Sequence, residues 1–573
     1  MRIEKLPFER EALGLWTDPS GRHANWPVVY TLNDKGEVYV GETLNAVGRM
    51  RQHLDNPDKK HLKSVRVIVD EQFNKSVCLD LESYLIRLFA GDGRFTVLNR
   101  NDGITNADYY DRKRYRELFD EIFELLRLDD LFTNSIEQIE NSDLFKLSPY
   151  KALNHDQEAA VVDVVEGLFD DLESNSANTV VIEGGPGTGK TIVAIYLMKL
   201  LVDIASTEPT DDQSSDSVFA DFFVEGHREL MRGFRIGLVV PQQSLRKSIK
   251  NVFRRTPGLS PAMVLTPYEV ARSRDPFDLL IVDETHRLTQ YGAQAMGTLT
   301  RDFREHSMRL AHKGERWEDL TQLDWIVRSS KQQILLLDRD QSVRPIDLPP
   351  KAVDRVREAA ADEGRSYTLR SQMRVQGGSD YIEYVRAALS DGPAPQRRGF
   401  DGYDLRFFDD LGRMHEAIRA RDRDEGLARL VAGYGWKWKS KKDSAAFDIE
   451  LDSTRLRWNR TAVDWINSPT SIDEVGSIHT VQGYDLNYAG VIVGPEVGWD
   501  PVTERLHLDR ARYFDAKGKA RNGLLDVDYS DEDVLGLVRN IYRVLLTRGM
   551  RGTYVYVCDT LLRQRLRGLL ASS

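Results

Sequence analysis

The chain has 573 residues, too many for one hydrophobic core, so two to four domains are expected. Its hydrophobic share of 41% and charged share of 29% are ordinary for a globular protein, and no run approaches the roughly 18 apolar residues of a membrane span. The formal net charge of -11 excludes a basic nucleic-acid coat, so any nucleic-acid binding must use local basic tracks.

Residues 1–105 are predicted to form a small α/β domain. Its expected elements are strands at 27–32 and 37–41, joined by a hairpin turn, and helices at 46–54 and about 76–89. The first helix places Arg49 and His53 one turn apart on one face. The second helix carries Glu82 among apolar neighbours.

These polar side chains suit phosphodiester hydrolysis, which needs an activated water, a cation on the scissile phosphate and help for the leaving oxygen. Glu82 can hold one divalent metal, Mg2+ or Mn2+, and Arg49 can clamp the phosphate. Tyr30 or Tyr39 would be the general base if the metal and neighbouring cations lower its pKa. The alternatives are an α/β domain whose tyrosines are core and whose Glu82 lies on a helix surface, or an inactive domain that only binds nucleic acid.

The order of these residues resembles the GIY-YIG nuclease family. Val28-Val29-Tyr30 stands where the first signature lies, without its glycine, and Tyr39-Val40-Gly41 stands where the second does. The remaining members follow in the order and approximate spacing of the family: Arg49, His53, Glu82 and Asn99. The resemblance implies a metal-dependent endonuclease in which all six side chains are catalytic, with His53 assisting proton transfer and Asn99 orienting the site.

Residues 106–149 are predicted to be a helical linker. Apolar side chains recur every three to four positions between 108 and 128, the spacing of a helix with one buried face. We expect this linker to pack on one or both neighbouring domains.

The strongest local pattern lies at 180–191, where an apolar run rich in β-branched residues enters G-x-x-x-x-G-K-T and then a helical segment. The glycines let backbone N–H groups turn toward phosphate oxygens, and the helix N-terminus adds its dipole. We therefore predict an ATP site with Lys190 on the β- and γ-phosphates and the Thr191 hydroxyl on Mg2+. A glycine-rich turn without a ligand is the alternative. The predicted nucleotide-contacting residues are Gly184, Gly185, Gly187, Thr188, Gly189, Lys190 and Thr191.

Two more apolar runs end in polar residues. Asp283 and Glu284 follow the run at 278–282 and predict a Walker B pair, with Asp283 on Mg2+ and Glu284 orienting the attacking water. A later run ends in Asp-x-x-Gln and resembles motif III of superfamily 1 helicases, which implies that Gln341 senses the γ-phosphate. The same resemblance implies that Gln157, one helix before the P-loop, contacts adenine.

Three segments further along the chain resemble helicase motifs IV, V and VI, at 369–374, 477–485 and 540–548. Arg374 and Arg548 would be the cations that stabilise charge on the transferred phosphoryl group. The predicted architecture is two RecA-like P-loop lobes with parallel sheets, at 150–365 and 366–573, the second with an inserted segment. The amino-acid sequences of 433–438 and of the motif V and VI segments further resemble the Schlafen-group helicase domain.

The combined prediction is a metal-dependent endonuclease coupled to an ATP-driven superfamily 1 helicase or translocase on DNA. A single-stranded segment would lie in the motor cleft. The combination of a nuclease with a motor suits defence against foreign DNA or repair. The alternative is an ATP-gated nucleic-acid sensor or switch whose N-terminal domain binds but does not cleave. With two distant cysteines and no visible signal peptide, a cytoplasmic protein with no membrane partner is expected.

Overall fold

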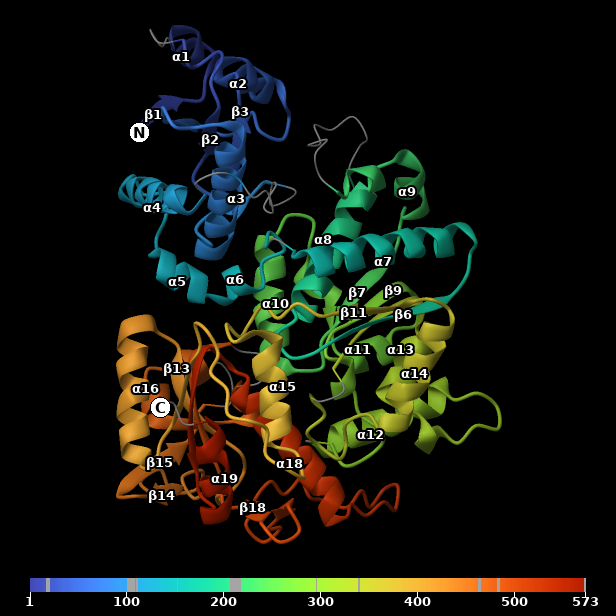
Figure 1. The fold of residues 1–573 in the computed structure, drawn as a ribbon. Coiled ribbons are helices and arrows are strands. Elements are labelled where there is room, and N and C mark those ends of the chain that lie inside the picture. The colour runs from blue at the N-terminus through green and yellow to red at the C-terminus, as the bar shows by residue number, and fades with distance from the viewer. Residues whose placement is uncertain are drawn as a thin grey trace. The chain divides into compact units, whose positions relative to one another are not determined.

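The structure is a computed structural model that describes residues 1–16, 21–99, 109, 112–151, 153–206, 218–294, 296–338, 341–461, 465–481 and 485–570. The chain forms two compact units, and each is described by itself (Figure 1). The first unit holds residues 1–162, 192–234 and 247–264, and the second holds 163–191, 235–246 and 265–573. Within the described ranges, no helix combines the length and the apolarity needed to cross a membrane.

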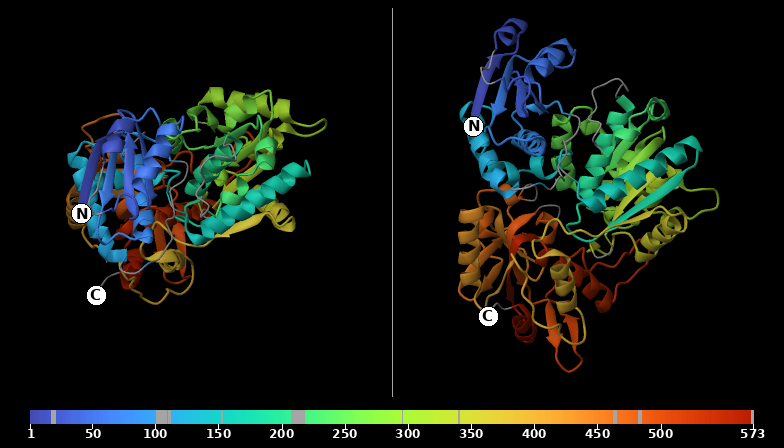
Figure 2. Two further views of the ribbon diagram at one scale, coloured as in Figure 1. Left: turned by 90° about the horizontal axis from the view of Figure 1, so that it is seen from above. Right: turned by 45° about the horizontal axis from the view of Figure 1, so that its top comes forward.

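The first unit begins with a five-stranded sheet whose strands lie side by side in Figure 2. In spatial order they are β1 (Arg2–Pro7), β4 (Ser64–Val69), β2 (Val28–Asn33), β3 (Glu37–Thr43) and β5 (Thr96–Val97). Neighbours are antiparallel except β3 and β5, which are parallel. The register of the β2–β3 hairpin sets Tyr30 directly opposite Gly41. The predicted hairpin is thus confirmed.

Six helices accompany this sheet: α1 (Arg10–Leu15), α2 (Ala46–Asp55), α3 (Lys75–Asp92), α4 (Arg112–Leu128), α5 (Ile136–Asn141) and α6 (Asp143–Lys146). Helix α3 begins where the Asn74 side chain accepts the Val77 amide and ends at Gly93, whose φ is +69°. Helix α4 buries Phe119, Ile122 and Leu126 in the same core as α3. The predicted helical segment between 108 and 128 therefore packs on the N-terminal domain.

The next sheet, which holds the P-loop strand, has six strands. In spatial order they are β11 (Ser366–Leu369), β6 (Asn178–Gly184), β10 (Ser330–Leu337), β9 (Phe277–Val282), β7 (Ile236–Val239) and β8 (Val264–Leu265). The pairs β11–β6, β6–β10, β10–β9 and β9–β7 are all parallel. Such strands are buried on both faces, which is why their sequences read as continuous apolar runs.

This sheet corrects one predicted boundary. The division between lobes was expected at 365/366, but β11 pairs with β6 over Ser366–Leu369 and so belongs to the first lobe. The sequence could not show this, because β11 is a short edge strand whose partner lies about 180 residues earlier. The other predicted domain ends remain predictions.

The second lobe contains a seven-stranded sheet and a separate hairpin. The sheet order is β12 (Asp404–Phe407), β20 (Gly549–Val557), β17 (Leu486–Val493), β13 (Ala428–Ala432), β16 (Glu474–Ser477), β15 (Thr454–Trp458) and β14 (Ile449–Leu451), and the hairpin is β18 (Val497–Asp500) with β19 (Arg505–Leu508). All sheet pairs are parallel except β14–β15. Two predominantly parallel α/β lobes are confirmed.

The remaining helices lie before, between or after these strands in the sequence. They are α7 (His155–Glu173), α8 (Lys190–Ser206), α9 (Glu225–Leu230), α10 (Gln243–Arg255), α11 (Pro267–Arg272), α12 (Gly297–Leu310), α13 (Gln322–Arg328), α14 (Pro350–Asp362), α15 (Gly378–Ala388), α16 (Leu411–Glu425), α17 (Ile478–Val481), α18 (Asp531–Leu546) and α19 (Thr560–Leu570). The seven-stranded sheet has two separate cores: α16 contributes to one, and α15, α18 and α19 to the other (Figure 1). In the six-stranded sheet, β6, β10 and β9 are parallel neighbours, so the loops that follow these three strands lie at one edge of that sheet.

Candidate functional site

The P-loop connects β6 to α8 and contains two glycines in the left-handed region. Gly187 has φ +82° and Gly189 has φ +80°, which side chains with a Cβ rarely adopt. A Cβ at Gly187 would also collide with the Gln372 side chain. The Thr188 hydroxyl donates to the Gly185 carbonyl at 3.0 Å and closes the loop. The backbone is therefore held in the curved form that can surround a phosphate.

Lys190 and Thr191 begin α8 beside the acidic groups of β9 and β10. Lys190 Nζ donates to the carbonyls of Gly184 at 2.8 Å and Gly185 at 3.0 Å, and lies 3.3 Å from Asp338 Oδ2. The Thr191 hydroxyl donates to Asp283 Oδ2 at 2.8 Å. The Thr191 hydroxyl and the Asp283 carboxylate thus lie side by side. A hydroxyl and a carboxylate are the two protein oxygen ligands that Mg2+ takes beside a nucleotide.

Glu284 follows Asp283 in a strained conformation, with φ +52°. Its Oε2 lies 2.9 Å from Nε2 of His286, a side chain only 1% exposed. The other ring nitrogen, Nδ1, accepts the backbone N–H of Asp338 at 3.3 Å. Because a backbone N–H can only donate, the imidazole proton belongs on Nε2, facing Glu284. His286 therefore links the Walker B carboxylate to the end of β10.

Gln341 joins this region through Asp338. Gln341 Nε2 donates to Asp338 Oδ2 at 2.6 Å, the oxygen that also lies near Lys190. The segment after Gln341 is bound to α18, since Asn540 Nδ2 donates to the Ser342 carbonyl at 3.0 Å. Motif III and motif VI are thus in direct contact.

Arg374 and Arg548 are brought together with Glu284. Arg374 Nε lies 2.5 Å from Asp485 Oδ1, and its neighbour Gln372 donates to the Pro186 carbonyl of the P-loop at 2.6 Å. Arg548 is buried, and both Arg374 and Glu284 influence its charge. The two arginines, predicted from segments 174 positions apart, are therefore neighbours, and Arg548 lies close enough to the Walker B acid Glu284 to be influenced by its charge.

Burial and charge act in opposite directions on these groups. Burial, with the charge of Glu284, raises the pKa of Asp283. Burial also opposes the charge on Glu284, but His286, Lys190 and Arg287 outweigh it and hold the Glu284 pKa far below its usual range. Burial and the Arg374 charge lower the pKa of Arg548 to about 9. Glu284 is thus held as an anion within a cationic surround.

The other predicted motor residues make different contacts or lie outside the described residues. Gln157 belongs to the first unit, where its side chain accepts the Asn154 amide at 3.1 Å and its own N–H donates to Asn154 Oδ1 at 2.9 Å. Its adenine contact stays a prediction. Arg246, near the start of α10, donates to the Val240 carbonyl at 2.7 Å. Residues 482–484 of motif V lie outside the described residues.

In the first unit, Tyr30 and His53 form a buried pair. The Tyr30 hydroxyl lies 2.7 Å from His53 Nε2, and neither residue is more than 2% exposed. The ring of Tyr30 crosses β3 over Gly41, where any Cβ would collide with the hydroxyl. Tyr39 is half-buried, with the Lys59 ammonium 3.7 Å from its ring centroid. The two predicted tyrosines are therefore neighbours, 6.2 Å between ring centroids.

Glu82 and Arg49 complete the cluster. Arg49 acts on the charge of both Tyr30 and Glu82. Burial and the neighbouring carboxylate of Glu42 raise the pKa of Glu82 to about 8. Glu42 itself contacts Lys75 at the start of α3, and its Oε2 is buried without a hydrogen-bond partner among the described residues. The region thus holds two half-buried carboxylates and two cations, and one carboxylate oxygen has no partner among the described residues.

The pKa values of Tyr30 and His53 differ from those expected of a general base and its partner. Burial raises the pKa of Tyr30 well above its usual value, with Tyr39 adding to the effect and Arg49 opposing it. Burial, with Lys59 and Arg49, lowers the pKa of His53 to about 3. His53 is therefore neutral at pH 7 and can accept a hydrogen bond from Tyr30, whereas the lowered tyrosine pKa that was expected is not present in the protein alone.

Asn99 has a structural contact. Its Oδ1 accepts the Val40 amide at 3.0 Å and its Nδ2 donates to the Val40 carbonyl at 2.8 Å. This bidentate pair fixes β3 between Tyr39 and Gly41. Asn99 therefore orients the site through the strand backbone.

Sequence reasoning missed five residues at these two sites: Glu42, Lys75, His286, Asp338 and Asp485. Glu42 directly follows the Tyr39-Val40-Gly41 signature, and His286 lies two positions after Glu284, so local position could have raised both. Asp485 is recognised only through its contact with Arg374, more than 100 positions away.

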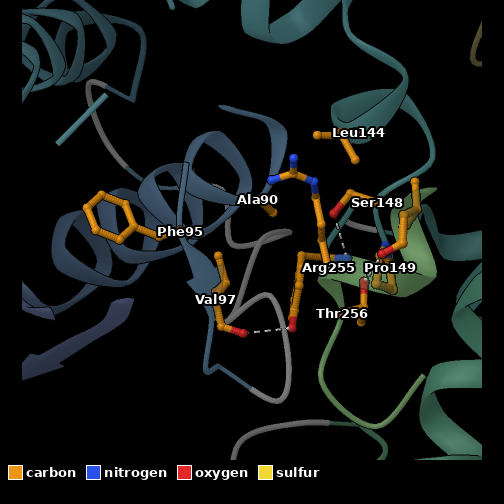
Figure 3. A pocket seen from close by; sticks show the side chains of 10 residues that line it. Ala90, Phe95, Val97, Leu144, Ser148, Pro149, Arg255 and Thr256 are labelled. Carbon is orange, nitrogen blue, oxygen red and sulfur yellow. Dashed lines mark hydrogen bonds between the residues drawn. The ribbon is translucent and has the colours of Figure 1, made fainter. Parts of the chain in front are cut away.

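A small pocket lies elsewhere in the first unit, between the end of α3, the segment 144–150 and α10 (Figure 3). Arg255 crosses it and donates to the Gly93 carbonyl, and the Tyr150 hydroxyl donates to the Val97 carbonyl at 3.3 Å. None of its ten lining residues is a predicted site residue.

Comparison with known proteins identifies the motor region. Residues 177–559 match the family described as "Schlafen group 3, DNA/RNA helicase domain". An uncharacterized protein of Saccharomyces cerevisiae, YPL245W, is 26% identical over 423 residues, which cover 67% of this chain and 83% of the yeast protein.

Two solved structures are weakly similar. Pif1 helicase from Bacteroides in complex with ADP-AlF3 and ssDNA is 11% identical with a TM-score of 0.25, covering 72% of this chain and 94% of that chain. Bacteroides Pif1 bound to ssDNA is 11% identical with a TM-score of 0.23, covering 70% and 93%. These two similarities are too weak to support an inference about this chain.

Proposed function

This chain belongs to the Schlafen group 3 DNA/RNA helicase-domain family, and on that premise we propose that it is an ATP-driven helicase or translocase whose N-terminal domain is a metal-dependent endonuclease. The observation that carries the motor part is the placement of Lys190, Arg287 and the Nε2 atom of His286 around Glu284. An anion held by fixed cations and a ring N–H donor is what orientation of a water against a nucleotide phosphate requires.

The chain's own residues divide the work of ATP hydrolysis. Lys190 would exchange its present carbonyl and Asp338 contacts for the β- and γ-phosphates. Glu284 would orient the attacking water, and Arg374 and Arg548 would stabilise the charge of the transferred phosphoryl group. The Thr191 hydroxyl and Asp283 carboxylate, 2.8 Å apart, fit Mg2+, which supplies the positive charge that neutralises the phosphates.

We propose a single-stranded segment of DNA as the polymer in the motor. The chain is acidic overall, with a net charge of -11, so binding must depend on local cations such as the exposed Lys247 of α10. Affinity should then fall steeply with salt, because each neutralised phosphate releases counterions. ATP turnover measured with single-stranded DNA, single-stranded RNA and no polymer tests this choice. Nucleotide binding without stimulation by either polymer would favour the sensor or switch.

The nuclease proposal is supported by the cluster of Tyr30, Arg49, His53 and Glu82. Glu82 is a half-buried carboxylate whose pKa is raised by burial and by the second carboxylate of Glu42, and one buried oxygen of Glu42 has no partner among the described residues. This donor set fits a divalent cation, which favours oxygen ligands and supplies charge at the scissile phosphate.

A proton path is also built into this cluster. The Tyr30 hydroxyl can donate a hydrogen bond to His53, which lies 2.7 Å away and is neutral at pH 7, and this bond orients the hydroxyl for proton transfer once a metal and a phosphate are bound. Arg49 stands beside Tyr30, where it would bind the phosphate and favour the phenolate. Tyr30 is therefore the better candidate for the general base, and Tyr39, covered by Lys59, is its matched control.

Separation of the two activities tests the whole proposal. The full chain is incubated with plasmid and forked oligonucleotides, with Mg2+ or Mn2+, with and without ATP. Glu82→Ala should end cleavage and leave DNA-stimulated ATP turnover intact, because the two sites share no residue. Glu121→Ala, an exposed acid on α4, should change neither activity. Tyr30→Phe should lose more cleavage than Tyr39→Phe. Cleavage that survives Glu82→Ala would reduce the N-terminal domain to a binding module.

A further inference from the structure

We propose that Glu42 is a second carboxylate ligand of the divalent cation in the N-terminal cluster, and that Lys75 holds the place of that cation until a metal binds. The inference rests on the proposed nuclease function of that cluster and adds a residue and a competition to it.

The geometry around Glu42 is that of an incomplete site. Glu42 lies on β3 immediately after Gly41, and its side chain is 14% exposed. One carboxylate oxygen, Oε1, contacts the Lys75 ammonium. The other, Oε2, is buried and lacks a hydrogen-bond partner within the described ranges. A buried carboxylate oxygen without a partner is costly, so it indicates a ligand that the protein alone does not supply.

Glu82 approaches the same place from α3. The backbone N–H of Glu42 donates to the Glu82 carboxylate, and the charge of Glu42 opposes ionisation of Glu82. Both carboxylates therefore belong to one small region, with Lys75 and Arg49 as its cations. These two cations leave Glu42 Oε2 without a partner among the described residues, whereas a divalent cation between the carboxylates would bond it.

Lys75 is suited to leave when a metal arrives. It is the first residue of α3 and its side chain is 50% exposed, so the ammonium can swing into water while the helix stays in place. Its present contact with Glu42 makes it a competitor of the metal. A purely structural ion pair would have the same geometry but the opposite response to removal of the lysine.

The experiment is a Mn2+ titration of the full chain without nucleotide, read by electron paramagnetic resonance of free Mn2+. An Asp283→Asn background removes the contribution of the motor site. Glu42→Gln should weaken Mn2+ binding by about tenfold or more, the scale of a lost ligand or its partner. Lys75→Met should tighten binding several-fold, a gain that misfolding cannot mimic. Lys35→Met, an exposed lysine of the β2–β3 turn, should leave the affinity unchanged and so corrects for net charge.

The outcomes separate this inference from the proposed function. Mn2+ binding that is lost with Glu82→Gln but unchanged in Glu42→Gln and Lys75→Met would overturn the inference and leave the metal site. Binding that responds only to Glu37→Gln would place the ion in the exposed group of Asp34, Glu37 and His61, and would overturn both. Weaker binding in Lys75→Met would make the lysine a structural partner and overturn the competition.

Discussion

The contact of His286 with Glu284 makes a sharp prediction about the motor. His286→Asn keeps an acceptor near the Nδ1 position, where the Asp338 amide donates at 3.3 Å, but removes the donor 2.9 Å from Glu284. His286→Gln does the reverse, because its amide nitrogen reaches the Nε2 position. The two variants have similar polarity and differ in which neighbour they keep.

The expected loss follows from the energy of the removed contact. A hydrogen bond to a charged group contributes about 1.5–3 kcal/mol, and about 1.4 kcal/mol is tenfold in rate. If His286 holds Glu284 for water orientation, His286→Asn should lower kcat about 10- to 100-fold, while His286→Gln retains most of it. ATP affinity should change less than about threefold in both, since neither variant touches the P-loop.

The assay is steady-state ATP turnover with single-stranded DNA, beside equilibrium binding of a fluorescent nucleotide. Equal losses of kcat in the two variants would refute the positioning role and leave His286 as a packing residue. Loss of affinity in parallel with kcat would also refute it, because the damage would then extend to nucleotide binding.

Three further predictions concern the second unit. Lys190→Ala should abolish ATP turnover, while Glu284→Gln should abolish turnover and keep ATP binding, both measured by phosphate release and nucleotide titration. Arg374→Ala and Arg548→Ala should each lower kcat about 10²-fold with a much smaller loss of affinity, and equal losses would make them binding residues. Glu496 is buried beside Tyr542, and burial raises its pKa to about 7, above the value in the unfolded chain. The free energy of unfolding of the wild type should therefore fall between pH 4.5 and 7 relative to that of Glu496→Gln. Thermal melts at pH 5 and pH 8 should show this difference in stability change by up to roughly 3 kcal/mol, and a difference that is the same at both pH values would contradict the raised pKa.

The parts of the fold that depend on nearby residues were predictable. The glycines, Lys190 and Thr191 form one contiguous segment, and the strand-to-helix setting follows from the apolar runs on either side. The hairpin of β2 and β3 was likewise readable, because its turn chemistry and strands are adjacent. Asn99 was expected at the site, but its role as a clamp on Val40 depends on a pairing 59 positions away.

The contacts that decide chemistry were less predictable because they join distant segments. The residues around Asp338 in the sequence do not indicate that its backbone N–H binds the His286 ring. Likewise, the residues around Glu42 do not indicate that Lys75 forms an ion pair with it. A short edge strand such as β11 carries too little pattern to reveal its partner.

The two proposed activities can be tested independently because the two proposed sites share no residue. The P-loop residues, Asp283, Glu284, Gln341, Arg374 and Arg548 lie in the second unit, whereas Gln157 and Lys247 lie in the first. The six predicted nuclease residues, Tyr30, Tyr39, Arg49, His53, Glu82 and Asn99, all lie in the first unit. A substitution at Glu82 therefore acts on the motor only if the units communicate, and Lys190→Ala acts on cleavage only for the same reason. Cleavage that stops with Lys190→Ala while Mn2+ binding at Glu82 persists would show that ATP turnover gates the nuclease, since the metal site would be intact and the substrate no longer delivered.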